Sequence, residues 1–96
     1  GMVVSNEPGL YRSGEYGIRI ENLIVVKEHC SSAFGQFYAF ETLTLFPYDT
    51  SAIEQSLLTE EEKNFINAYH ERVYRKLSPY LTKTECKWLA RKTKAI

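Results

Sequence analysis

The sequence has little of what marks the specialised classes of protein. Its 96 residues include only two cysteines, Cys30 and Cys86, too few for a disulfide framework or a cysteine-based zinc cluster. We expect both thiols to be reduced. No segment approaches the roughly 20 apolar residues of a membrane span, and the first residues lack the basic and apolar regions of a signal peptide. These absences favour a cytoplasmic protein with no membrane partner.

An excess of charge is also missing. Twelve basic and twelve acidic side chains balance, so the total indicates neither nucleic acid nor an anionic membrane as partner. The distribution is uneven, because residues 1–58 hold three basic and seven acidic side chains, and residues 59–96 hold nine and five. The first part is therefore where a cation site is expected. The basic side chains of the second part are scattered around helices and indicate a solvated surface.

Apolar and alternating runs at residues 2–5, 17–27 and 37–46 predict three β-strands, and residues 6–9 and 12–17 are predicted to be turns. The turn-rich stretches between them are short, which favours an antiparallel meander, and residues 29–36 are predicted to form a loop. We expect the aromatic residues of these strands to belong to the core.

Two helices are predicted after the strands. Thr59 and Glu62 form a capping box that begins the first, and Ser78-Pro79 ends it. Thr82 and Glu85 repeat the capping box for a second helix, which is expected to bury Trp88 and Leu89. The predicted fold class is α+β, with a small antiparallel sheet of about three strands followed by two C-terminal helices.

Two carboxylates in the strand region could hold a metal. If residues 2–7 and 17–26 pair around a turn centred near Gly14, Glu7 lies opposite Glu21. Like charges opposite each other destabilise a sheet, and one carboxylate would tend to keep its proton. A pair of divalent cations would remove this repulsion and could activate a water molecule. Spacing alone nevertheless favours solvated surface carboxylates, with Glu21 paired to Arg19 or Arg12.

A resemblance changes this weighting. Residues 5–11 (SNEPGLY) and 17–22 (GIRIEN) resemble the last two metal-ligand motifs of the Xaa-Pro aminopeptidases. These enzymes are pita-bread metallopeptidases, related to prolidase, creatinase and methionine aminopeptidase. Residues 40–47 (FETLTLFP) resemble the strand that follows in the aminopeptidase branch, and the helical tail resembles its C-terminal extension. The resemblance implies that residues 1–50 are C-terminal strands of a pita-bread catalytic domain and residues 51–96 a helical extension.

The resemblance also implies roles for individual residues. Glu7 and Glu21 match metal ligands, with Glu21 bridging two divalent ions that are expected to be manganese. Tyr11 and Arg19 match the residues that support these ligands through hydrogen bonds. The family's other ligands, two aspartates and a histidine, have no counterpart here. His29 and His70 match no ligand position, and both are predicted to be surface or packing residues.

The implied function is metal-dependent hydrolysis that releases the N-terminal residue from peptides with proline in second position. The chain alone is expected to be inactive, with its metal site empty. One alternative is a related prolidase-type dipeptidase, against which the helical tail argues. The other is a non-catalytic interaction segment that forms a homodimer through the aromatic helix faces of the C-terminal region, with Tyr69, Tyr80 and Trp88.

Overall fold

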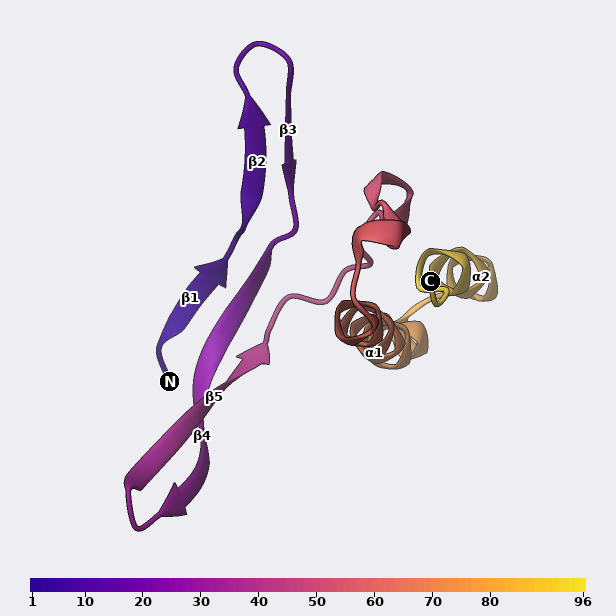
Figure 1. Ribbon diagram of the computed structural model, residues 1–96. Coiled ribbons are helices and arrows are strands. Elements are labelled where there is room, and N and C mark those ends of the chain that lie inside the picture. Colours follow the sequence, from indigo (N-terminus) through magenta and orange to yellow (C-terminus); the bar gives the residue numbers. More distant parts are fainter. The chain divides into compact units, whose positions relative to one another are not determined.

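A computed structural model describes residues 1–96, which form two compact units, Gly1–Thr44 and Leu45–Ile96. All five strands lie in the first unit and both α-helices in the second (Figure 1). The predicted α+β class, with antiparallel strands followed by two C-terminal helices, is confirmed. No helix combines the length and apolar character that crossing a bilayer would need.

The first unit is built on one long hairpin. Its strands are β1 (Val3–Asn6), β2 (Gly9–Arg12), β3 (Tyr16–Arg19), β4 (Asn22–Ser32) and β5 (Gly35–Thr42), which form a three-stranded sheet, β1-β4-β5, and a two-stranded sheet, β2-β3. Asn6 pairs with Asn22 in one sheet and Gly9 pairs with Arg19 in the other. Both registers centre on Gly14, so β1 and β2 form one arm of the hairpin and β3 and β4 the other (Figure 1).

The turn at the hairpin tip requires glycine. Gly14 has a φ of 72°, in the left-handed region that glycine adopts without a steric penalty. The predicted pairing around this residue is therefore confirmed, and the arms are interrupted only at residues 7–8 and 20–21.

The loop predicted at residues 29–36 is wrong. β4 continues to Ser32 and β5 begins at Gly35, so most of this segment is a second hairpin. A β-bulge between Glu28 and Cys30 takes up one extra residue, and the side chains of Ser31 and Gln36 are hydrogen-bonded across the strands. Serine and glycine, which indicated a loop, belong here to a paired strand end. β5 ends at Thr42, earlier than the predicted Phe46.

The first unit has no hydrophobic core of its own. Its only buried residue is Asn22, whereas the strand aromatics Phe37, Tyr38 and Phe40 are exposed. The expectation that these aromatics are core residues is not met within this chain. The Asn22 side chain donates hydrogen bonds to the Oγ1 and carbonyl oxygen of Thr44, at 2.8 and 3.4 Å, which ties the start of β4 to the segment after β5.

The second unit contains α1 (Glu60–Leu77) and α2 (Lys83–Lys92) with three short 3₁₀ turns, Thr50–Ala52, Gln55–Leu57 and Ser78–Tyr80. Both predicted capping boxes are confirmed. The carboxylate of Glu62 accepts a hydrogen bond from the Thr59 N–H at 2.8 Å, and that of Glu85 accepts from Thr82 at 2.7 Å. These contacts satisfy backbone donors that a helix start leaves free.

The core of this unit is small. Tyr69, Val73 and Leu89 are buried in it, and Leu45, Tyr48, Leu77 and Leu81 pack against them. Trp88, predicted to be buried beside Leu89, is 41% exposed. Adjacent residues on a helix point about 100° apart, so a helix that buries Leu89 turns Trp88 away from the core, where its ring lies 6.5 Å from that of Phe46.

Two residues of α1 fix the segment that leads into the helices. The Tyr69 hydroxyl accepts from the Phe46 N–H at 3.2 Å and donates to its carbonyl oxygen at 3.0 Å. The Nε2 of His70 accepts from the Tyr48 N–H at 3.0 Å. Because Nε2 accepts, the proton of the neutral ring resides on Nδ1, which has no hydrogen-bond partner. His70 is fully buried and His29 is exposed, which confirms the prediction that they are packing and surface residues.

Burial lowers the pKa of His70 below its ordinary value of 6.5. The unfolded chain therefore takes up a proton below pH 6.5 that the folded chain excludes. We expect the stability conferred by neutral His70 to be complete above pH 6.5 and to be lost as the pH falls toward the lower folded pKa. The His70→Gln variant, which keeps an acceptor for Tyr48 but cannot titrate, should lose less stability on acidification.

Urea unfolding followed by the circular dichroism of the helices, at about pH 7.5 and about pH 5.5, measures this difference. His29→Gln is the matched control, since it makes the same chemical change at an exposed site. The interpretation is wrong if His29→Gln flattens the pH dependence as much as His70→Gln does.

Candidate metal centre

Glu7 and Glu21 lie where the long hairpin is interrupted. The register on either side of the break places residue 7 opposite residue 21. Arg19 Nη1 lies 2.9 Å from Glu7 Oε2 and 3.3 Å from Glu21 Oε2. Both carboxylates are therefore turned toward the same nitrogen atom, on the same side of the sheet. The convergence expected from the sequence is present.

The charges of this cluster do not cancel. One guanidinium faces two carboxylates, which leaves a net negative charge at the break. The side chains of Glu7, Arg19 and Glu21 remain 49, 40 and 46% exposed, and ion pairs so exposed contribute only about 0.2–1 kcal/mol each. The cluster is thus held loosely by its own charges and favours the approach of further positive charge.

Tyr11 contacts the guanidinium of Arg19 at Nε, away from the Nη1 that faces the glutamates. Its hydroxyl accepts a hydrogen bond from Arg19 Nε at 2.8 Å, and the guanidinium carbon lies 5.8 Å from the centre of the ring. The pKa of Arg19 is raised above its ordinary value, chiefly by its hydrogen bond to Tyr11 and further by the charges of Glu21 and Glu7. Arg19 therefore stays charged at every physiological pH.

Ser5 is a contact that the sequence reasoning missed. Its hydroxyl donates to Glu7 Oε1 at 2.7 Å, so each oxygen of Glu7 is engaged, one by Ser5 and the other by Arg19. The available signal was the spacing, because residues two apart on a strand share a face. Together with the Arg19 contact, this bond limits the rotation of the carboxylate.

The two carboxylates suit a hard divalent cation, since carboxylate oxygens are the donors that Mg²⁺ and Mn²⁺ prefer. They do not complete a site, because nowhere does the chain bring together three or more histidine, cysteine, aspartate or glutamate side chains that could hold a metal ion.

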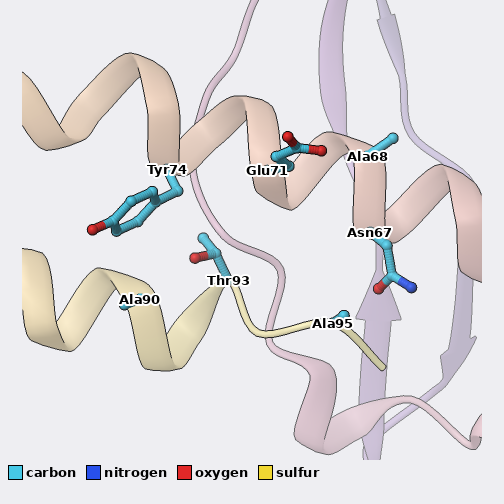
Figure 2. A pocket seen from close by; sticks show the side chains of 7 residues that line it. All are labelled: Asn67, Ala68, Glu71, Tyr74, Ala90, Thr93 and Ala95. Carbon is cyan, nitrogen blue, oxygen red and sulfur yellow. The ribbon is translucent and has the colours of Figure 1, made fainter.

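A concave site elsewhere in the chain offers no better donors. It is a groove of about 480 Å³ in the helical unit, lined by Asn67, Ala68, Glu71, Tyr74, Ala90, Thr93 and Ala95 (Figure 2). Glu71 is its single carboxylate, and the groove contains neither histidine nor cysteine. The candidate metal centre therefore remains the break in the hairpin.

Comparison with known proteins identifies the family. Residues 1–28 match metallopeptidase family M24, and residues 36–96 match the family described as the C-terminal region of peptidase_M24. The chain belongs to metallopeptidase family M24. The family expected from the motifs around Glu7 and Glu21 is confirmed.

Individual relatives agree with this assignment. The chain is 48% identical to a probable Xaa-Pro aminopeptidase P of Coprinopsis cinerea, over 100% of its own length and 16% of that protein. It is 47% identical to a probable Xaa-Pro aminopeptidase P of Pyrenophora teres f. teres, over 97% of its length and 15% of that protein. The chain thus spans only about one sixth of these relatives.

A solved structure matches the fold. The crystal structure of X-prolyl aminopeptidase from Caenorhabditis elegans, described as a cytosolic enzyme with a di-nuclear active site, superposes with a TM-score of 0.85. Sequence identity is 41%, and the match covers 98% of this chain and 16% of that one. The expected membership in the pita-bread fold, as part of its C-terminal portion, is confirmed.

The incomplete donor set predicts weak metal binding by the 96-residue chain alone. Two carboxylates that already share a guanidinium should bind Mn²⁺ with a Kd weaker than about 1 mM. Calorimetric titration of the chain with Mn²⁺ measures this, with the Glu7→Gln variant for comparison. Binding with a Kd below about 10 μM that is lost in the Glu7→Gln variant would show that the chain assembles a full ligand set.

Proposed function

We propose that the full-length protein is a metal-dependent aminopeptidase that releases the N-terminal residue from peptides with proline in second position. The convergence of Glu7 and Glu21 on one point, within motifs of family M24, carries this proposal. The names of the relatives supply the substrate class, and the similarity to a di-nuclear enzyme supports two ions. Manganese suits the carboxylate donors, and the description of the neighbour as cytosolic favours a cytoplasmic location.

Each residue of the cluster has a distinct part in the proposed site. Two bound ions would polarise the scissile carbonyl group and supply an activated water molecule. Glu7 and Glu21 would hold the ions. Arg19 orients both carboxylates through Nη1, and Tyr11 fixes Arg19 through Nε. Arg19 and Tyr11 are thus positioning residues, because their contacts reach the ions only through the glutamates.

The remaining ligands must come from elsewhere in the protein. In this proposal residues 1–50 are the last strands of the catalytic domain and residues 51–96 are a helical extension, so the chain by itself is inactive. The relatives named as Xaa-Pro aminopeptidases favour this specificity over that of a prolidase-type dipeptidase.

Glu21→Gln in the full-length protein tests the metal role. It preserves the shape of the side chain but removes the charge, and we expect activity on an Xaa-Pro peptide to fall about 100-fold or more. Bound Mn²⁺, measured by elemental analysis, should fall with it. Glu28→Gln, the same change at an exposed position in β4, is the control and should leave both quantities unchanged.

The outcomes separate the two parts of the proposal. Retention of both ions and of activity in Glu21→Gln would show that the ligand assignment is wrong. Equal cleavage of matched peptides with proline and alanine in second position would instead show that the substrate class is wrong.

The alternative role as an interaction segment rests on exposed aromatic side chains. Tyr80 is 86% exposed and Trp88 41%, which leaves both free to contact a second copy. Tyr69, expected in the same role, is buried in the core and cannot do so. Homodimerisation through this unit predicts that Trp88→Ala shifts a dimer toward monomer in light scattering at micromolar concentration, without loss of helical content.

A further inference from the structure

The face of the β2–β3 hairpin that carries Tyr11 and Arg19 has glycine at its two remaining positions. Tyr11 pairs with Gly17 across the strands, and Gly9 pairs with Arg19. The four residues form a square in which the two large side chains occupy one diagonal and the two glycines the other. Residues of the same parity on paired strands point to the same face, so these four positions share one surface.

The ring of Tyr11 fills the space over both glycines. A Cβ atom at Gly17 would lie 2.6 Å from Cδ1 of the ring, and one at Gly9 would lie 2.6 Å from the hydroxyl oxygen and 2.9 Å from the ring carbons. Such distances are shorter than any ordinary carbon contact. A side chain at either position would therefore require the tyrosine to move.

Backbone conformation gives no other reason for these glycines. Positive φ angles occur at Gly14 and Gly35 and not at Gly9 or Gly17. Glycine inside a strand costs stability, because it loses more conformational entropy and has no side chain to pack, and it often marks a close approach. The close approach in this hairpin is that of the Tyr11 ring.

The position of that ring is transmitted to the carboxylates. The Tyr11 hydroxyl, which lies over Gly9, accepts from Arg19 Nε at 2.8 Å, and Nη1 of the same guanidinium contacts both Glu7 and Glu21. We propose that Gly9 and Gly17 are positioning residues of the metal site. Because they carry no side chain, they form a flat platform against which the Tyr11 ring packs. In this position Tyr11 aligns Arg19, and Arg19 aligns the two glutamates. This inference rests on the proposed function.

A double-mutant cycle in the full-length protein tests the platform. Gly17→Ala should displace Tyr11 and weaken Mn²⁺ binding about 10- to 100-fold, the usual effect of disturbing residues that orient metal ligands. Tyr11→Ala should weaken it to a similar extent. Because both changes act through the same ring, adding Gly17→Ala to Tyr11→Ala should cause no further loss.

Mn²⁺ affinity is measured by competition with a chelator, and the metal-free protein is melted in parallel to follow folding. Ser13→Ala, an alanine substitution in the tip of the same hairpin, is the control and should leave the affinity unchanged. Gly9→Ala repeats the cycle at the hydroxyl end of the ring, and it decides the question if Gly17→Ala does not fold.

Two results would overturn the inference alone. One is an unchanged Mn²⁺ affinity in both Gly17→Ala and Gly9→Ala. The other is that a glycine-to-alanine change weakens Mn²⁺ binding as much in the Tyr11→Ala protein as it does when Tyr11 is present. In either case Glu21→Gln would still abolish metal binding. An unchanged affinity in Glu21→Gln would overturn the proposed function, and the platform with it.

Discussion

The structure around the candidate site depends on how one guanidinium is placed between two carboxylates. The register of the long hairpin sets Glu7 against Glu21, an arrangement that repulsion would otherwise destabilise. Arg19 reduces the repulsion without removing it, because a single positive charge faces two negative ones. The strand pairing is interrupted at these residues, so the carboxylates extend from irregular backbone that is held on each side by regular pairing.

The two units of the chain differ in what stabilises them. The helical unit has its own core around Tyr69, Val73 and Leu89, with capping boxes at both helix starts. The strand unit buries only Asn22 and leaves most of its large apolar side chains exposed. Strands of this kind need a covering layer to be stable. The chain spans about one sixth of its relatives, and the proposed site lies on the unit that lacks a core.

Local sequence signals predicted those features that depend on a few neighbouring residues. Symmetry about Gly14 gave the hairpin register, and the Thr–Glu spacing gave both helix starts. The errors arose where a distant contact decides the outcome. The bulge near His29 depends on pairing with β5, and the exposure of Trp88 depends on which face of α2 meets α1. The contact of the Tyr11 ring with Gly9 and Gly17 required the assembled face of the hairpin, since glycine does not signal a metal site by itself.

The geometry also explains why the residue between the carboxylates is arginine. A lysine ammonium is a single point of charge on a flexible stem, whereas guanidinium presents donors in several fixed directions. Here Nε is directed to Tyr11 and Nη1 to the glutamates, so one planar group is anchored at one edge while it orients ligands at another. Each carboxylate has about four lone-pair sites, and a fixed donor occupies only some of them. A mobile cation at this position would compete with metal ions for the same oxygens. A guanidinium held in place by Tyr11 occupies a fixed part of these lone-pair sites and leaves the others available to metal ions.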